Sequence, residues 1–159
     1  TTVFAYGLNV ANGVAVDDAN SAVFVVETGS YRVWRFPMDG SAGTVVLENL
    51  PGFPDNINNA PDGTFWVGLV SPRNPVMDQL ANSPFLRRVI MRLPDAMKPA
   101  PLRYGFVLRM DASGKVLETL QDPAGDYALT TGAVTLPDGR IAVTSLTEPR
   151  LGMLDAAPR

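Results

Sequence analysis

Residues 131–143 read TGAVTLPDGRIAV, and residues 55–67 read DNINNAPDGTFWV. In both stretches a small or polar opening leads into a short β-prone run, a Pro-Asp-Gly turn and a second apolar run. The glycine of the turn follows the second residue of the opening by seven positions in each case. Residues 12–26, NGVAVDDANSAVFVV, are a looser copy. A strand-turn-strand unit that recurs every roughly 40 residues or more is typical of a propeller blade, so we predict an all-β fold of the β-propeller type.

The strand pattern predicts one partial β-propeller domain over residues 1–159, with blades at about 7–50, 53–122 and 128–159. The expected strands lie at residues 13–17, 22–28, 31–37 and 43–48, then at 55–59, 64–70, 105–111 and 115–121, and finally at 131–136, 140–146 and 150–154. The fold is therefore expected to contain about three blades of a larger ring.

Three blades do not close a ring, because propellers typically have four to eight. We expect the ring to be completed by a missing N-terminal half of a longer protein, by a second chain, or by the pairing of copies. Residues Thr2–Tyr6 are β-prone and fit a strand that enters from such a neighbour.

A long insertion, residues 71–104, interrupts the second blade. Two of its runs have proline near the start and apolar residues at mixed spacings of three and four, which predicts short helices. An excursion of this length is typical of a lid or an assembly surface. It is equally compatible with a cap over the hydrophobic end of the blade.

Composition excludes several classes of function. The net charge of −3 gives no electrostatic footprint for nucleic acid, and no apolar run in this segment is long enough for a membrane span. The chain has no Cys and no His, which excludes catalytic triads with His, thiol nucleophiles and zinc sites of the usual kind within it. Any bound metal is therefore expected to have oxygen ligands, which favours Ca²⁺, Mg²⁺ or Mn²⁺.

The openings of the repeats are the candidate functional positions. Blades converge on an axis, so Asn12, Asp55 and Thr131 are expected to face one central site. A carboxylate and two amides there would offer oxygen ligands to a hard cation. One more carboxylate would bring the net charge of a divalent ion and its ligands close to zero. The alternative is structural, because Asn and Asp at strand starts also organise turns.

Other conspicuous residues have structural interpretations. Glu27 and Arg32 are expected to form a solvated ion pair on a blade surface. Trp34, Phe65 and Trp66 lie in β-like runs and are expected in the core.

Four short motifs carry a resemblance to a known family. They are ANGV at residues 11–14, LPGFPDNIN at 50–58, FWVG at 65–68 and SPRNP at 71–75. Together they resemble the C-terminal half of a strictosidine synthase-like protein, a group similar to the six-bladed propellers that include senescence marker protein, gluconolactonase and paraoxonase. The resemblance covers most of residues 5–155.

The resemblance implies a divalent cation, Ca²⁺ or another such as Mg²⁺ or Mn²⁺, at the centre of the propeller. The family's Asn-Gly and Pro-Asp ligands fall on Asn12 and Asp55, and the paraoxonase-like pattern adds Asn56. A further Glu ligand of the family comes from a blade that this chain does not contain. The alkaloid-condensing enzyme that gives the subgroup its name uses a glutamate late in its sequence, and that position falls on or near Gly132 of this chain. Because glycine has no carboxylate, the resemblance does not imply the condensation reaction here.

The function implied is a divalent-metal-dependent hydrolase of lactones or esters, resembling a calcium-dependent lactonase. Asp55 would serve as metal ligand and catalytic general base, and the small-molecule lactone or ester would bind beside the ion. The alternative is a non-catalytic propeller that binds a small ligand or a protein at its axial mouth, because a fold does not fix a function.

Overall fold

The computed structural model describes residues 3–74, 92 and 102–155. The helices predicted within the insertion fall largely on residues 75–91 and 93–101, which lie outside the described residues. No helix in the described part of the chain is long and apolar enough to cross a membrane.

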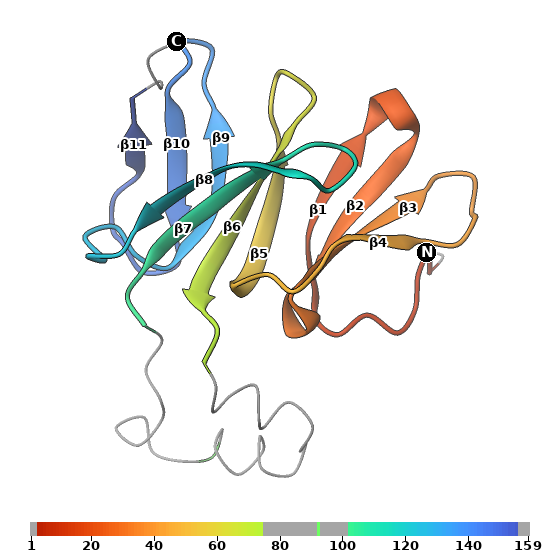
Figure 1. Cartoon of the computed structure of the whole chain (residues 1–159), viewed down its shortest axis with the longest axis horizontal. Coiled ribbons are helices and arrows are strands. Elements are labelled where there is room, and N and C mark those ends of the chain that lie inside the picture. The colour runs from red at the N-terminus through yellow and green to blue at the C-terminus, as the bar shows by residue number, and fades with distance from the viewer. Residues whose placement is uncertain (1–2, 75–91, 93–101, 156–159) are drawn as a thin grey trace.

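Within the described residues, eleven strands form three antiparallel sheets, shown in Figure 1. Sheet 1 contains β1 (Ala11–Asp17), β2 (Ala22–Glu27), β3 (Arg32–Pro37) and β4 (Thr44–Leu47). Sheet 2 contains β5 (Gly52–Asn59), β6 (Phe65–Pro72), β7 (Gly105–Met110) and β8 (Val116–Asp122). Sheet 3 contains β9 (Thr130–Thr135), β10 (Ile141–Ser145) and β11 (Gly152–Leu154). Each sheet is built from strands that pair in chain order.

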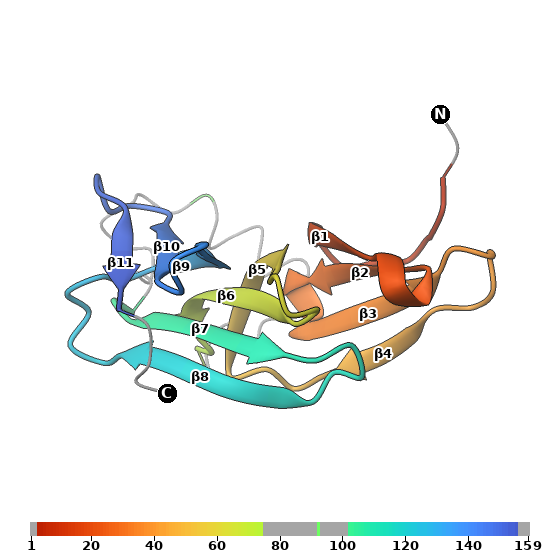
Figure 2. The same ribbon diagram turned by 90° about the horizontal axis from the view of Figure 1, so that it is seen from above.

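The sheets fan out from their first strands. In Figure 2, β1, β5 and β9 lie along one side of the molecule, and β4 and β8 lie on the opposite side. We call β1, β5 and β9 the inner strands. This arrangement is that of a partial β-propeller, so the predicted fold class is confirmed.

The predicted strands occur within a few residues of their expected positions, with one exception. Residues 3–6 form no strand, although Thr2–Tyr6 was expected to enter as one. A strand needs the backbone groups of a neighbour to pair with, and no described strand lies in position to supply them. The side chain of Phe4 instead packs edge-on against Phe36 of β3.

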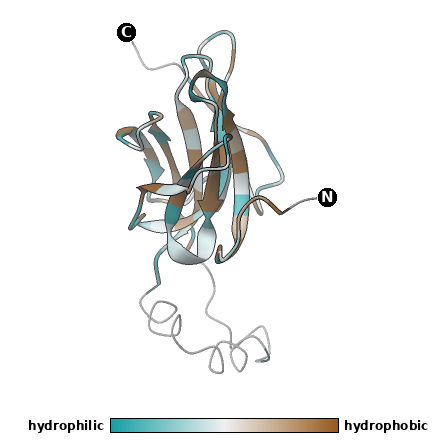
Figure 3. Ribbon diagram, turned by 90° about the vertical axis from the view of Figure 1, so that its right-hand side faces the viewer, coloured by the Kyte–Doolittle hydropathy of each residue, from teal (hydrophilic) through white to brown (hydrophobic). Residues whose placement is uncertain are grey.

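Two apolar layers hold the three sheets together. Between sheets 1 and 2, the Phe24 and Phe65 rings lie 4.7 Å apart among buried aliphatic side chains. Between sheets 2 and 3, Trp66 packs against Ala133 and Val143. Phe65 and Trp66 are core residues as expected. Figure 3 shows hydrophobic residues concentrated along the packed strands.

Glu27 corrects a prediction about the surface of the first blade. It is paired with Arg32 as expected, but the carboxylate is fully buried rather than solvated. Arg32 Nε donates to Oε2 at 2.6 Å, the Asn9 N–H and the Ser30 hydroxyl each donate to Oε1 at 2.8 Å, and Trp34 Nε1 also donates. The antiparallel pairing of β2 with β3 places Arg32 directly opposite Glu27, which explains the burial of this charge.

The donors around Glu27 determine its charge state. Burial of the carboxylate raises its pKa, but the hydrogen bonds from Arg32, Asn9, Trp34 and Ser30 outweigh burial and lower the pKa from 4.5 to about 2. Glu27 is therefore ionised throughout the neutral range. The carboxylate ties the segment before β1 to the start of β3.

We expect Glu27→Gln to lower the free energy of unfolding by about 3 kcal/mol at pH 7. Because folding depresses the pKa of Glu27, its contribution is complete above pH 4.5 and is lost as the pH falls towards about 2. Urea unfolding of both proteins from pH 7 to pH 2.5 measures this: the gap in stability should narrow below pH 4.5. Glu48→Gln, the same change at an exposed position, is the control. A constant gap across this range would contradict the assigned charge.

Candidate metal site at the propeller axis

Each inner strand carries one extra residue relative to the strand with which it pairs. In β1 the extra residue lies between Ala11 and Val14, and in β5 it lies between Pro54 and Ile57. In β9 the extra residue is Thr131, because its neighbours Thr130 and Gly132 pair with the consecutive residues Ser145 and Thr144 of β10. These are β-bulges, which bend a strand and redirect a side chain. All three occur at the opening of the sequence repeat.

The first two bulges bring two of the predicted site residues together. Asn12 Nδ2 donates a hydrogen bond to Asp55 Oδ1, although the two residues are 43 positions apart. Asn12 Nδ2 also lies 3.3 Å from the Thr28 hydroxyl, and that hydroxyl donates to the Pro54 carbonyl at 2.6 Å. Thr28 thus connects the Asn12 side chain to the residue directly before Asp55.

Asn56 and Thr131 lie at the next contact, between β5 and β9. An ideal Cβ atom built on Gly132 would lie 3.4 Å from the Asn56 Cβ and 2.8 Å from Asn58 Oδ1. A side chain at position 132 would therefore displace the Asn58 amide. The Thr131 hydroxyl bonds the Thr144 hydroxyl within sheet 3 at 2.9 Å, so it is already engaged there.

Glycine makes the close approach of adjacent sheets near the inner strands possible. An ideal Cβ on Gly13 would lie 2.6 Å from both Asn56 Cα and the Ile57 nitrogen, which is closer than real Cβ atoms come. Gly68 lies in the same way against the backbone of Thr131. The absence of a side chain at these positions brings the backbones of adjacent sheets into direct contact.

The electrostatic environment of Asp55 differs from that of Glu27. Burial raises the pKa of Asp55, and the hydrogen bond from Asn12 offsets this only in part. The carboxylate therefore lies in a half-buried position where its negative charge is poorly stabilised. A bound cation beside it would relieve this cost.

The chemistry of the donors fits a hard cation. No group of three or more His, Cys, Asp or Glu side chains suited to a metal ion occurs among the described residues. A metal here would instead be held by one carboxylate and by amide oxygens, which Ca²⁺ accepts readily. Asn12 as placed points its amide nitrogen towards Asp55, and a half-turn of the amide group exchanges nitrogen for oxygen.

Sequence reasoning missed two features of this site. It identified Asn12 and Asp55, but it overlooked Thr28, which follows β2 and carries no motif of its own. It also overlooked the bulges. The sequence feature that could have predicted the bulges is the small or polar triplet that opens each repeat, because a residue without a ladder partner is tolerated there.

No family model matches the chain, but it is clearly similar to individual proteins. It is 35% identical over 162 residues to "Protein STRICTOSIDINE SYNTHASE-LIKE 10" of Arabidopsis thaliana, covering 97% of this chain and 43% of that protein. It is 36% identical over 154 residues to "Adipocyte plasma membrane-associated protein" of Bos taurus, covering 91% of this chain and 37% of that protein.

Solved structures show the same fold. A regucalcin from Agrobacterium tumefaciens, described as a calcium-binding protein, aligns with a TM-score of 0.56 and 18% identity over 89% of this chain and 40% of that one. A luciferin-regenerating enzyme aligns with a TM-score of 0.55 and 16% identity, covering 87% of this chain and 38% of that one. Both neighbours are six-bladed propellers.

The chain belongs to the strictosidine synthase-like superfamily. It spans about two fifths of the length of the superfamily members quoted above. Three sheets of a six-bladed fold agree with that share.

We expect Gly13→Ala to destabilise the protein by roughly 1–3 kcal/mol, because the new methyl group meets the backbone of Asn56 and Ile57. Gly29→Ala is the matched control, since the three atoms nearest to its methyl group all belong to the Asn9 side chain, which can turn away. Thermal and urea unfolding of the two variants measure the difference. Equal stability of the two variants would contradict the close contact of β1 with β5.

Proposed function

We propose that the chain carries part of the axial site of a divalent-metal-dependent hydrolase of lactones or esters. Asn12, Asp55 and Asn56 would hold the ion, with Ca²⁺ preferred over Mg²⁺ or Mn²⁺. The observation that supports this is the meeting of Asn12 and Asp55 at two adjacent bulges of the inner strands. Regucalcin, which shares the fold, is described as a calcium-binding protein.

The three residues differ in what they would contribute. Asp55 supplies the negative charge, and the amides of Asn12 and Asn56 supply neutral oxygens. Thr28 acts as a positioning residue, because its hydroxyl bonds the Pro54 carbonyl and lies within reach of the Asn12 amide. One carboxylate leaves a divalent charge half-neutralised, so a second anionic ligand is needed from another part of the ring.

The proposed chemistry is hydrolysis of an acyl bond. A bound divalent ion would polarise the substrate carbonyl and lower the pKa of water beside it. Asp55 would accept the proton of the attacking water as general base. The buried aliphatic layer behind β5, which includes Ile57 and Val67, limits access of bulk water from that side.

A second candidate is a non-catalytic propeller that binds a small ligand or a protein at the same mouth. It is favoured by the sequence at position 132, where the condensing members of the superfamily are expected to carry a glutamate and this chain has glycine. The metal would then have a structural role.

We expect Asp55→Asn to abolish Ca²⁺ binding and lactone hydrolysis, because the variant keeps the shape of the side chain but removes its charge. Calorimetric titration with Ca²⁺ measures binding, and a panel of lactones and aryl esters assayed with and without EDTA measures activity. Asp39→Asn, the same change in an exposed turn, should behave as the parent protein.

The outcomes separate the two candidates. Hydrolysis that survives both EDTA and Asp55→Asn would contradict the proposed mechanism. Ca²⁺ binding that is lost in Asp55→Asn, without hydrolysis of any panel member by the parent chain, would favour the binding propeller. Equal Ca²⁺ affinity of the parent and Asp55→Asn proteins would contradict the metal site itself.

A further inference from the structure

Arg73, directly after β6, carries a positive charge that no described carboxylate balances. Its guanidinium carbon lies 4.0 Å from the centre of the Tyr31 ring, and the Tyr31 and Phe53 rings pack with their centroids 4.8 Å apart. None of the ion pairs within the described residues includes Arg73. Its Nε is buried and has no hydrogen-bond acceptor there, although the residue as a whole is only partly buried. A buried donor without an acceptor is rare in folded proteins and calls for a ligand or another partner.

The backbone of Arg73 is fixed where β5 begins and β6 ends. Gly52 pairs with Pro72, and an ideal Cβ atom on Gly52 would lie 2.5 Å from the Ser71 carbonyl oxygen. The Arg73 N–H donates to the Pro51 carbonyl at 3.0 Å. Figure 1 shows both strand ends together at the lower end of sheet 2. Backbone pairing and the aromatic stack therefore position this side chain without the help of an ion pair.

The stack shares its two supporting segments with the candidate metal site. Tyr31 ends the connection that begins at Thr28, and the Tyr31 N–H donates to the Thr28 carbonyl at 3.4 Å. Phe53 directly precedes Pro54, whose carbonyl accepts the hydrogen bond from the Thr28 hydroxyl. Asp55 is the next residue in the chain. The stack thus lies where two described sheets meet, and not on either outer face of the fan.

The separation of Arg73 from Asp55 follows from the strand register. Asp55 lies three residues after Gly52, and the strand partner of Gly52 is Pro72, the residue before Arg73. Three residues of a strand span roughly 10 Å. Two side chains of opposite charge therefore lie at the same end of sheet 2, about the length of a small organic molecule apart.

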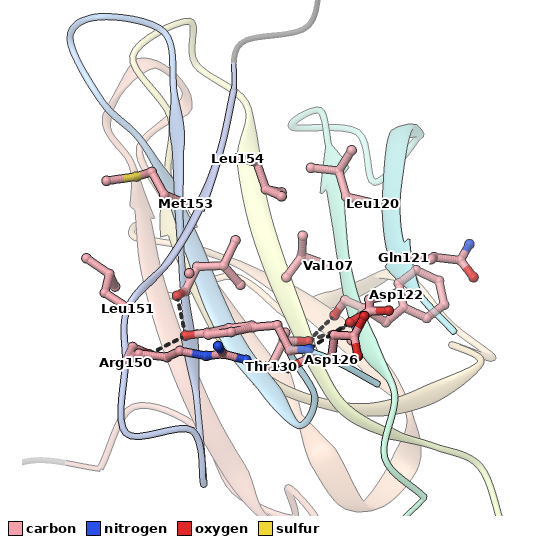
Figure 4. Close-up of a pocket in the computed structure, with 15 residues that line it drawn as sticks. Val107, Leu120, Gln121, Asp122, Asp126, Thr130, Arg150, Leu151, Met153 and Leu154 are labelled. Atoms are coloured by element: carbon pink, nitrogen blue, oxygen red, sulfur yellow. Dashed lines mark hydrogen bonds between the residues drawn. The ribbon is translucent and has the colours of Figure 1, made fainter. Parts of the chain in front are cut away.

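Other arginines of the described chain differ from Arg73 in having carboxylate partners. Arg32, in the same region of sheet 1, binds Glu27 at 2.6 Å. Arg150 lines the cavity between sheets 2 and 3 that Figure 4 shows. Its Nη2 donates to the Asp126 carbonyl at 2.7 Å, and its Nε lies 3.8 Å from a carboxylate oxygen of Glu148. The chain thus balances these charges internally and leaves that of Arg73 for another group.

The chemistry of the guanidinium defines what that group is. Arginine stays protonated at all relevant pH values, and its planar donors match the two oxygens of a carboxylate. Stacking on an aromatic ring orients this plane before a ligand arrives. A single cation balances a single negative charge, which favours a carboxylate over a phosphate monoester of charge close to −2.

We infer that Arg73 binds a carboxylate of the substrate, so that the axial site acts on esters or lactones that carry a second, anionic group. This inference rests on the proposed function and names its substrate class. The carboxylate binds at Arg73, and the acyl carbon lies beside Asp55, which explains the separation of the two charged side chains. Arg73 takes no part in the reaction itself. Its effect is on substrate binding and selectivity.

A binding experiment tests Arg73 without metal or catalysis. NMR titration in EDTA with monomethyl suberate, a linear ester with one carboxylate, should show saturable binding. Arg73→Gln should raise the dissociation constant at least about tenfold, because a charged pair of hydrogen bonds is lost. Arg73→Lys keeps the charge but not the planar fork and should give an intermediate value. Dimethyl suberate has the same length without the charge, and the parent chain should bind it at least about tenfold more weakly.

Arg35→Gln is the matched control for this titration. Arg35 also lacks a carboxylate partner among the described residues, and its guanidinium donates only to the Asn20 carbonyl, at 3.3 Å. Asn20 lies in the β1–β2 turn, at the opposite end of sheet 1 from Tyr31. The Arg35→Gln variant should bind monomethyl suberate as the parent chain does.

Hydrolysis tests the same residue at the proposed site. Mono-4-nitrophenyl esters of linear dicarboxylic acids, from glutarate to sebacate, place a carboxylate at increasing distances from the acyl carbon. Their methyl-capped counterparts are neutral. The ratio of kcat/KM for the charged ester to that for the neutral ester should be greatest at one chain length and should fall at least about tenfold in Arg73→Gln. The change should lie mainly in KM, because Arg73 contacts only the bound carboxylate.

The titration and the kinetics distinguish failure of this inference from failure of the hydrolase. Equal binding of monomethyl suberate by the parent and Arg73→Gln proteins, both folded by circular dichroism, would overturn the inference whether or not hydrolysis is detected. Binding that depends on Arg73, without hydrolysis of any ester, would support carboxylate recognition and contradict the hydrolase. Tighter binding of hexyl phosphate than of hexanoate would overturn the assignment to a carboxylate.

Discussion

The direct backbone contact between adjacent sheets near their inner strands is the constraint on which the rest of the structure depends. Gly13 of β1 lies against Asn56 and Ile57 of β5, and Gly68 of β6 lies against Thr131 at the start of β9. Without a Cβ atom at these points, the sheets approach until their backbones touch, and they can then diverge outwards as a fan. Side chains from different sheets meet at the narrow end of that fan. Asn12 reaches Asp55 for this reason.

The buried charge of Glu27 supports the same region from behind. Its carboxylate accepts hydrogen bonds from Asn9, which precedes β1, and from Arg32, which begins β3. These bonds fix the tight connection that contains Thr28, and Thr28 in turn bonds the carbonyl of Pro54. A fully satisfied buried carboxylate is costly to disturb, since removing one partner leaves a charge without solvent. The position of Asn12 is therefore set by contacts on both sides of β1.

The repeated triplets predicted the strands and the pairing of Asn12 with Asp55, because strand propensity, turn residues and radial repetition are local properties of a sequence. The bulges were not predictable in this way, since an extra residue is defined only by the register of a partner strand. The burial of Glu27 was missed for a related reason. Its donors come from separate segments that β2 and β3 bring together only in the folded sheet. Residues 3–6 have strand propensity but no neighbouring strand to pair with in the described residues. Propensity alone therefore predicted a strand that the structure does not contain.

The candidate site and the exposed apolar side of β1 are two consequences of the same geometry. Asn12 and Val14 lie in the same strand, one at its bulge and one on its uncovered face. Any partner that covers the Val14 face must place its own inner strand beside β1, because sheets in a propeller pack with their first strands towards the axis. A neighbouring sheet that packs on this face would therefore bring the side chains of its own inner strand close to Asn12.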